Sequence, residues 1–264
     1  MRRFDAEYLE HTRRGMWAES REALSALDLP ARDRVLDVGC GTGELTRVLR
    51  DEADGDVVGC DADPELLTHV APPTVAGDAY RLPFPDDTFD LVVCQALLIN
   101  LTEPERSLAE FVRVSRDSVA VIEPDNAAVT VESTVPTEAS LARKARGHYR
   151  SGVETDIALG SDLGSLLAAS GLASIDVARY DHARTIEPPY SQQHLEGARR
   201  KASGQGLDDD RATMLAGDLS VEAYDALRER WREMGRAVID QMRDGVYERT
   251  ETVPFYVATG HVPE

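Results

Sequence analysis

The sequence predicts an α/β fold built on a doubly wound, seven-stranded and mostly parallel sheet. Three observations predict it. Short apolar runs of strand length recur along the chain, segments with helical spacing separate most of them, and a glycine-rich loop follows the first run. Strands that alternate with helices are typical of a parallel sheet covered on both faces.

Seven apolar runs are expected to form the strands of this sheet. They are residues 34–38, 56–60, 75–76, 89–94, 118–122, 174–180 and 254–260. The run at 89–94 has the unbroken apolar character of a strand that is buried on both faces.

Helices are expected between these strands and before the first one. They are residues 5–27, residues 44–50, a helix from residue 64, a helix from residue 104 and residues 161–170. Pro64 suits a first helical turn because its missing N–H has no partner there in any case. The pattern TEPE at 102–105 predicts a capping box, and Gly171 suits a left-handed helix end.

Two segments, 126–160 and 187–250, break the alternation of strands and helices. The first carries a basic cluster, made up of Arg143, Lys144, Arg146 and Arg150. The second carries an apolar stripe at helical spacing, made up of Val221, Tyr224, Leu227, Trp231, Met234, Val238 and Met242. Such a stripe favours packing against a core over a groove for a partner.

The composition excludes several classes of protein. A hydrophobic content of 42% is too high for a disordered acidic tail, and no apolar run approaches the roughly 20 residues that span a bilayer. The chain has 29 basic and 48 acidic residues, a net charge of −19, which disfavours nucleic acid and anionic membranes as partners. The N-terminus has no apolar segment of the kind found in secretory signals, so we expect a cytoplasmic protein.

The basic residues are almost all arginines, since Lys144 and Lys201 are the two lysines of the chain. High acidity with little lysine is similar to proteins of salt-accumulating archaea and favours a halophilic source. A GC-rich genome is the alternative. The three cysteines, Cys40, Cys60 and Cys94, show no spacing of a metal site or a disulfide framework and are expected to be buried filler.

The glycine loop, VLDVGCGTGE at 35–44, is the most informative stretch of the sequence. Glycines allow left-handed turns and let a ligand approach the backbone. The dinucleotide fingerprint G-x-G-x-x-G, counted from Gly39, requires glycine at position 44, where this chain has Glu44. A carboxylate there would repel a pyrophosphate at the helix N-terminus, so the loop suits a nucleoside ligand without a diphosphate.

Three stretches taken in order, VLDVGCGTG, VVGCDADP and AGDAYRLPFPDDTFDLVVCQALLINL, resemble the class I S-adenosylmethionine-dependent methyltransferases. The resemblance is to the small-molecule group typified by ubiquinone and menaquinone biosynthesis enzymes, and it covers about residues 34–122. It implies a Rossmann-like methyltransferase fold with helical insertions that form a lid. It also implies S-adenosyl-L-methionine as cofactor and S-adenosylhomocysteine as product.

The resemblance implies roles for the residues of the glycine loop and of the second strand. Asp37 would lie beneath the loop and bond loop amides or, through water, the ammonium of the methionine part. The backbone of Gly39, Cys40 and Gly41 would pass close to that part. Asp61 would accept both ribose hydroxyls, since a carboxylate has two oxygens for two donors.

Four further residues are assigned to the adenine and sulfonium ends of the cofactor in the same way. Ala62 would pack on the adenine, Asp78 would accept its amino group, and Ala79 would offer a backbone amide. A plain Gly-Asp turn is the alternative for Asp78. Gln95 would line the cofactor near the sulfonium, although relatives often have Asn or His there.

The resemblance also gives the parts of the chain their expected functions. Residues 1–264 form one methyltransferase domain, in which residues 1–29 are an N-terminal helical cap and 30–125 the cofactor-binding half. Segments 126–160 and 187–250 are acceptor-side or lid insertions. Tyr8, Arg13 and Trp17 either close over the cofactor or serve ordinary helix packing and solvation.

The predicted function is methyl transfer to a small-molecule acceptor by in-line displacement. An RNA or protein methyltransferase and a non-catalytic S-adenosylmethionine-binding protein are the alternatives. Glu44 disfavours an NAD-dependent oxidoreductase, whereas Glu123 and Asp125 keep an aminopropyltransferase open. No catalytic residue and no metal ligand is assigned. The sequence does not indicate the acceptor or the oligomeric state.

Acceptor-side candidates at strand ends are Gln95, Asn100, Glu123, Asp125 and Asn126. Conceivable bases are His148 with Tyr149, His182 and His194. No spacing singles one of them out as a base.

Overall fold

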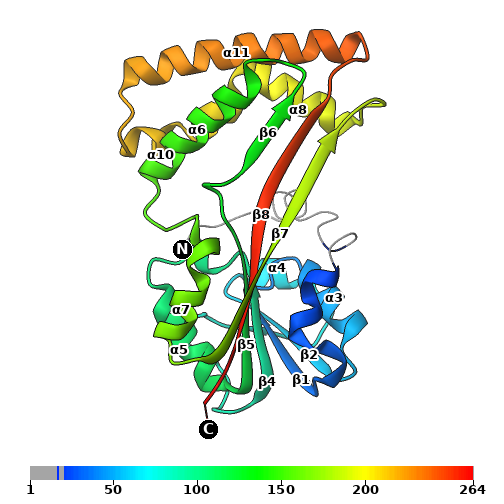
Figure 1. Cartoon of the computed structure of the whole chain (residues 1–264), viewed down its shortest axis with the longest axis vertical. Coiled ribbons are helices and arrows are strands. Elements are labelled where there is room, and N and C mark those ends of the chain that lie inside the picture. The colour runs from blue at the N-terminus through cyan, green and yellow to red at the C-terminus, as the bar shows by residue number, and fades with distance from the viewer. Residues whose placement is uncertain (1–16, 18–20, 264) are drawn as a thin grey trace. The chain divides into compact units, whose positions relative to one another are not determined.

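The structure is a computed structural model that describes residue 17 and residues 21–263 (Figure 1). Most of the helix expected at 5–27 lies outside the described residues, which include Trp17 and a 3-10 helix, η1 (Arg21–Leu27). The chain divides into two compact units. The first unit comprises Met1–Asp125, Ala158–Tyr180 and Pro254–Glu264, and the second comprises Asn126–Ile157 and Asp181–Val253.

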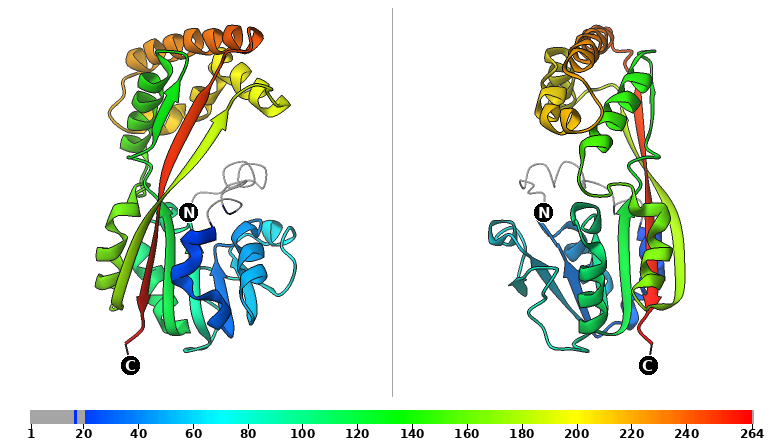
Figure 2. Two further views of the ribbon diagram at one scale, coloured as in Figure 1. Left: turned by 45° about the vertical axis from the view of Figure 1, so that its right-hand side comes forward. Right: turned by 90° about the vertical axis from the view of Figure 1, so that its left-hand side faces the viewer.

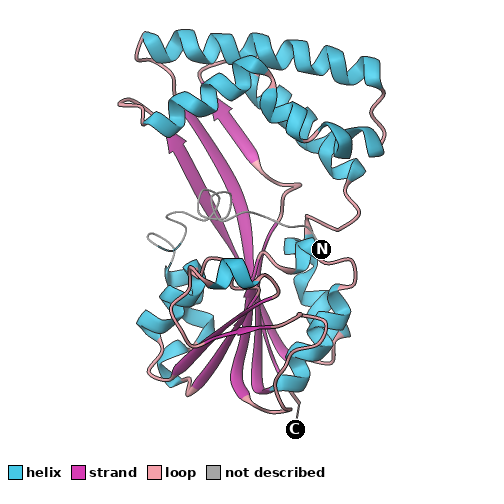
Figure 3. Cartoon of the chain, turned by 180° about the vertical axis from the view of Figure 1, so that it is seen from behind, coloured by secondary structure: helices cyan, strands magenta, loops and turns pink. Residues whose placement is uncertain are grey.

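The first unit holds a sheet in which strands β1 to β5 run parallel in the order β3-β2-β1-β4-β5 (Figure 3). Strand β8 joins β5 antiparallel, and β7 pairs with β8. The strands are β1 (Arg34–Val38), β2 (Asp56–Asp61), β3 (Thr74–Ala76), β4 (Phe89–Gln95), β5 (Ser115–Pro124), β7 (Ala173–Ile186) and β8 (Arg249–His261). The seven predicted strands are therefore confirmed.

The helices of the first unit follow the strands as the sequence pattern predicts. They are η2 (Leu29–Ala31), α3 (Glu44–Glu52), α4 (Pro64–Leu67), η3 (Leu98–Asn100), α5 (Pro104–Val114), η4 (Leu159–Asp162) and α7 (Leu163–Ala169). Gly171 has φ +87° just beyond α7, as its left-handed role requires. The predicted capping box at 102–105 is wrong, because α5 has Glu103 at its N-cap without a side-chain bond and starts on Pro104 instead.

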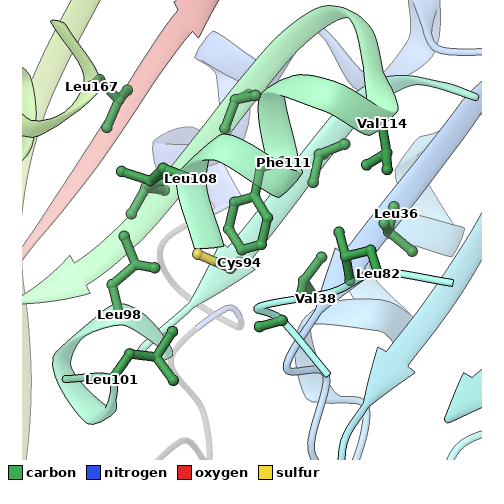
Figure 4. Packing of buried hydrophobic residues seen from close by; sticks show 14 of the residues in the cluster. Leu36, Val38, Leu82, Cys94, Leu98, Leu101, Leu108, Phe111, Val114 and Leu167 are labelled. Atoms are coloured by element: carbon green, nitrogen blue, oxygen red, sulfur yellow. The ribbon is translucent and has the colours of Figure 1, made fainter. Parts of the chain in front are cut away.

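The sheet of the first unit buries both of its faces. Leu36 of β1 belongs to the core cluster that α5 and α7 cover with Phe111 and Leu167 (Figure 4). Val35, one residue earlier, belongs to a second cluster with Leu49 of α3. Successive side chains of a strand point to opposite faces, so both faces carry helices, and the doubly wound prediction is confirmed.

The second unit is mainly helical (Figure 2). Its elements are β6 (Thr130–Ser133), α6 (Glu138–Gly152), α8 (Gln192–Ser203), α9 (Gln205–Asp209), α10 (Arg211–Ala216) and α11 (Val221–Arg243), with the ends of β7 and β8. The predicted apolar stripe lies on α11, where all but two of its members are buried in the core of this unit. Val221 is exposed and Trp231 is half-buried.

Strands β7 and β8 are longer than the predicted runs 174–180 and 254–260. Strand β7 continues to Ile186 and β8 begins at Arg249, so that both strands belong partly to the second unit. Strand β6 pairs antiparallel with this part of β8 and is an eighth strand, which was not predicted from the sequence. In the part of the chain that is described, no helix has the length and apolar character that crossing a bilayer requires.

A half-buried carboxylate, that of Glu251, makes the second unit sensitive to acid. Burial opposes the charge of Glu251, but Arg249 and Arg184 outweigh it and lower the pKa of this carboxyl to about 2. A carboxyl with a lowered pKa in the folded state stabilises the fold above its unfolded pKa of about 4.3 and loses that contribution as the pH falls toward the folded value.

We therefore expect the free energy of unfolding to fall between about pH 4.5 and pH 2, by up to about 1.4 kcal/mol per pH unit from Glu251 alone. Urea unfolding at several pH values measures this slope. The Glu251→Gln variant has no carboxyl to protonate, so its slope should be shallower. Equal slopes for the two proteins would contradict the assignment.

Candidate functional site

The glycine loop connects β1 to α3 at the carboxyl end of the sheet. Gly39, Gly41 and Gly43 have φ values of +69°, +55° and +79°, which side chains with a Cβ rarely adopt. The amides of Gly39 and Cys40 both donate to the carbonyl of Cys60 in β2, at 2.7 and 3.1 Å. The loop is thereby fixed against the end of the neighbouring strand.

Asp61 is the last residue of β2 and faces this loop. Its Oδ2 accepts a hydrogen bond from the amide of Gly41 at 2.8 Å, and its Oδ1 accepts one from the amide of Asp63 at 2.9 Å. Each carboxylate oxygen has two lone pairs, so both oxygens can accept a further donor. The side chain is half-buried, and the two amides fix its orientation.

Asp63 and Ala62 follow at the start of α4. Asp63 is the N-cap of α4 and accepts from the amide of Glu65 at 2.9 Å. Asp63 therefore caps this helix, and Asp61 does not. Ala62 lies exposed between the two aspartates.

Asp37 lies inside the first unit, beneath the loop. It is 1% exposed, and its Oδ2 accepts from the hydroxyl of Thr46 in α3 at 2.6 Å. The carboxylate thus joins β1 to α3 on either side of the glycine loop. No sequence motif links Thr46 to Asp37, so this hydrogen bond was not predicted.

Asp78 and Ala79 lie just after β3. Asp78 is exposed, accepts from the amide of Tyr80 at 2.9 Å through Oδ1, and forms an isolated bridge with Arg81. These bonds build the tight turn that was the alternative reading of Asp78. Ala79 is 4% exposed and packs in the core. The amide of Gly77 donates to the Asp61 carbonyl at 3.0 Å and so ties this turn to the end of β2.

Gln95 ends β4, the strand next to β1. It is 2% exposed and accepts a hydrogen bond from Nε1 of Trp17 at 3.2 Å. Trp17 is 3% exposed and belongs to a core cluster with Leu24 and Leu27, which favours the packing alternative for this residue. Tyr8 and Arg13, the other two residues considered for closing over the cofactor, lie outside the described residues.

Glu123 holds the loop that follows β4, a role that the sequence did not reveal. Its carboxylate is fully buried, and Oε1 accepts from the amides of Leu97 and Leu98 at 2.9 and 2.7 Å. Nδ2 of the Asn100 side chain donates to the Ala96 carbonyl at 2.8 Å, and Ala96 has φ +48°. Glu123 is therefore a positioning residue for this loop.

The remaining acceptor-side candidates, Asp125 and Asn126, lie on either side of a boundary between the two units along the chain. Asp125 is 8% exposed, at the last position of the first segment of the first unit. Asn126 belongs to the second unit and donates to the Ile157 carbonyl at 2.7 Å. His148 contacts the carboxylate of Asp218 at 3.3 Å.

The other conceivable bases also belong to the second unit. His194 forms the capping box of α8 with Ser191. Tyr149 and His182 lie in α6 and β7. The structure therefore singles out none of the conceivable bases for proton transfer.

The cysteines are free and buried, as expected. Burial raises the pKa of the Cys60 thiol to about 12, and it raises those of Cys40 and Cys94 as well. The three side chains are protonated near neutral pH and cannot serve as thiolate nucleophiles. Among the described residues, no group of three or more His, Cys, Asp or Glu side chains is placed to hold a metal ion.

The glycine loop gives a testable stability effect at Gly39. The Gly39→Ala variant should lose about 1–2 kcal/mol of unfolding free energy, because φ +69° is strained for a residue with a Cβ. That Cβ would also lie 2.8 Å from Cδ1 of Leu97. Urea unfolding measures the loss. Gly147, inside α6 with no atom within 4 Å of its added Cβ, is the matched control, and Gly147→Ala should stabilise by about 0.5–1 kcal/mol. Equal effects of the two substitutions would contradict the prediction.

Comparison with known proteins finds methyltransferases that are similar to the part of the chain that holds this site. The model of a methyltransferase domain matches residues 36–122. An uncharacterized methyltransferase of Schizosaccharomyces pombe is 34% identical over 101 residues, which are 32% of this chain and 36% of that protein. A demethylmenaquinone methyltransferase of Streptomyces avermitilis is 34% identical over 107 residues, 39% of this chain and 46% of that one. The chain thus spans less than half the length of these two relatives.

Solved structures share the fold. A Bacillus halodurans protein assigned as a methyltransferase superposes with a TM-score of 0.54 at 14% identity, over 94% of this chain and 100% of that one. The matched residues 36–122 contain all of β2, β3 and β4 and most of β1 and β5, together with the glycine loop and Asp61. Residues 36–122 of the chain are therefore similar to a methyltransferase domain, and the fold is the one that solved methyltransferase structures share.

Proposed function

We propose that the chain transfers a methyl group from S-adenosylmethionine to a small-molecule acceptor and releases S-adenosylhomocysteine. The observation that carries the proposal is the carboxylate of Asp61, which the amides of Gly41 and Asp63 fix at the end of β2 beside the glycine loop. The domain match over residues 36–122 and the relatives named demethylmenaquinone methyltransferase support methyl transfer and a small acceptor.

The residues present fit such a cofactor. Gly39 and Gly41 keep the loop free of Cβ atoms where the methionine part would pass, and the two oxygens of Asp61 suit the two ribose hydroxyls. Ala62, exposed next to Asp61, would pack on the adenine, and Asp78 with the amide of Ala79 would contact its polar edge. Glu44 at the first position of α3 disfavours a diphosphate.

S-adenosylmethionine, when bound, supplies an electrophilic methyl group on a positively charged sulfur. The contribution of the protein is to hold the acceptor in line with this methyl group and to exclude water. Asp37 and Cys40 would support the methionine end from beneath and from the loop, and Gln95 would line the sulfonium end. A general base is needed only for an acceptor that must lose a proton, and we assign none.

The second unit is proposed to bind the acceptor or to form a lid. This follows the prediction that segments 126–160 and 187–250 are acceptor-side or lid insertions. Its boundaries, Asn126–Ile157 and Asp181–Val253, differ from those segments by a few residues. The cytoplasmic location and the adaptation to high salt that the composition predicts stay predictions.

Calorimetric titration tests the proposed function directly. We expect S-adenosylhomocysteine to bind with one site per chain and NADH to leave no heat of binding. Binding of NADH with no binding of S-adenosylhomocysteine would overturn the proposal in favour of a dinucleotide enzyme. Binding without methyl transfer to any member of a metabolite extract, followed with a labelled methyl donor, would favour a non-catalytic binding protein.

A further inference from the structure

Three arginines surround one carboxylate in the second unit. Nη2 of Arg249 donates to Oε2 of Glu251 at 2.6 Å, and Nη2 of Arg184 donates to Oε1. Nη2 of Arg146 lies 3.9 Å from Oε2 of the same carboxylate. The four side chains come from α6, β7 and β8, so their meeting is a product of the fold and not of sequence proximity.

The charges of this cluster do not balance. Lys201 and Glu138 adjoin it, since Oε1 of Glu138 lies 3.3 Å from Nε of Arg249 and accepts a bond from Nζ of Lys201. In the described interactions of these groups, four cations, Arg146, Arg184, Arg249 and Lys201, face two carboxylates, Glu138 and Glu251. An excess of two positive charges is therefore gathered in a chain whose net charge is −19.

Such an excess is costly in partly buried surroundings unless an anion compensates it. The pKa of Arg146 is lowered, mainly because burial disfavours its charge. Glu251 acts in the opposite direction, and repulsion by Arg249 and Arg184 lowers the pKa further. Glu251 therefore does not by itself satisfy the three guanidinium groups around it.

The arginines also have hydrogen-bond donors to spare. A guanidinium carries five N–H donors. With partners in the described part of the chain, Arg146 makes one hydrogen bond, to the Val129 carbonyl at 3.0 Å, and Arg184 makes one, to Glu251. Nε of Arg249 is buried and has no hydrogen-bond partner among the described residues.

Nε of Arg249 is covered, but parts of all three arginine side chains are open to solvent. The side chains of Arg146, Arg184 and Arg249 keep 21%, 35% and 14% of their exposure, so they are covered but not sealed. Arg146 differs in this respect from its neighbours in the basic cluster of the sequence, because Arg143, Lys144 and Arg150 are exposed on the same helix.

We propose that Arg146, Arg184 and Arg249 form a binding site within the second unit for an oxyanion, a phosphate or carboxylate group. Guanidinium groups bind both kinds of oxyanion through paired N–H donors, and three of them from separate elements can enclose one. Since the excess is two charges, a phosphate dianion should bind more tightly than a monocarboxylate.

Thermal unfolding of the full chain tests the site without any assay of activity. Sodium phosphate, sodium acetate and sodium chloride are compared at matched ionic strength. We expect phosphate to raise the Tm in a saturable way, acetate to raise it less, and chloride at the same ionic strength to reproduce neither effect. Equal curves for phosphate and chloride would show charge screening alone and would overturn the site.

Variants locate the effect. Arg146→Gln should weaken the apparent phosphate affinity at least tenfold, whereas Arg143→Gln, on the exposed side of the same helix, should leave it unchanged. If Arg146→Gln fails to fold, Arg184→Gln takes its place, because Arg184 is the most exposed of the three. A phosphate response that survives Arg146→Gln or Arg184→Gln would overturn the proposal.

The failure of this inference is distinguishable from the failure of the proposed function. Arg146→Gln should leave the affinity for S-adenosylhomocysteine unchanged, since the residues proposed to hold that molecule all lie in the first unit. Absence of phosphate binding with normal S-adenosylhomocysteine binding refutes the oxyanion site alone. Normal phosphate binding without S-adenosylhomocysteine binding refutes the proposed function alone.

Discussion

Glu138→Ala is expected to lower the unfolding free energy of the second unit by about 3–5 kcal/mol. Glu138 is 1% exposed, and its carboxylate accepts bonds from Lys201, from Ser133 at 2.6 Å and from Tyr247 at 3.0 Å. Burial disfavours its charge, but Lys201 outweighs this effect and lowers the pKa of the carboxyl. Removal of Glu138 leaves the buried ammonium of Lys201 without its counter-ion, which is the costly half of a buried ion pair.

Fluorescence can follow this unit by itself. The chain has two tryptophans, so in a Trp17→Phe background Trp231 of α11 is the sole tryptophan and reports on the second unit. Urea unfolding in this background measures the loss. Asp209→Ala is the matched control in the same unit, because Asp209 makes an ion pair with Arg200 in which both side chains keep more than half of their exposure, and its loss should stay below about 1 kcal/mol.

The double variant Glu138→Ala with Lys201→Ala gives a sharper test. Because both charges of the pair are then removed, its loss should be smaller than the sum of the losses of the two single variants. Additive losses, or a loss below about 1 kcal/mol for Glu138→Ala, would show that the two side chains do not depend on each other.

The sequence was sufficient to predict the parallel half of the sheet. Apolar runs such as residues 89–94 are buried on both faces, and this burial leaves an unbroken hydrophobic pattern that can be recognised without a structure. The glycine loop at 39–43 could also be predicted, because only a few backbone conformations require glycine at alternate positions. Both signals are local in the sequence.

The strands of the second unit were harder to predict from the sequence because they carry polar residues. Beyond Tyr180, strand β7 continues with Asp181, His182 and Arg184, and no apolar run marks its end. Strand β7 pairs with β8 alone, so its side chains are exposed or half-buried along its whole length. Hydrophobic periodicity, which served well for the central strands, carries no signal in such an edge strand.

The sequence indicated which residues belong to the candidate site, but it did not indicate their hydrogen-bond partners. The importance of Asp61 followed from its motif, yet nothing in the sequence says that its carboxylate accepts from Gly41, twenty positions earlier. In the same way, the bond from Thr46 to Asp37 and those from Leu97 and Leu98 to Glu123 join residues that only the fold brings together. Hydrogen bonds of this kind depend on tertiary packing, which no local pattern encodes.

Asp61→Ala is expected to weaken the binding of S-adenosylhomocysteine by about 1–3 kcal/mol, or roughly 5-fold to 150-fold in Kd. Two effects combine. The ribose hydroxyls lose the acceptor that would pair with them, and the amides of Gly41 and Asp63 lose the carboxylate that orders the loop. Asp61→Asn should fall between wild type and Asp61→Ala, because its amide keeps one acceptor oxygen but presents a donor where the second oxygen was.

The control for Asp61 lies two residues away. Asp63→Ala removes a carboxylate of the same size and charge from the same turn, and its loss should cost the N-cap of α4 and leave the affinity for S-adenosylhomocysteine within about twofold. Calorimetric titration of the variants separates the alternatives. An affinity that falls equally for Asp61→Ala and Asp63→Ala would mean that general negative charge or loop folding matters there. An affinity that Asp61→Ala leaves unchanged would remove the residue from the site. Only a loss specific to Asp61 agrees with a carboxylate that pairs with the ribose, because the two residues share a turn and a charge but only Asp61 bonds the glycine loop.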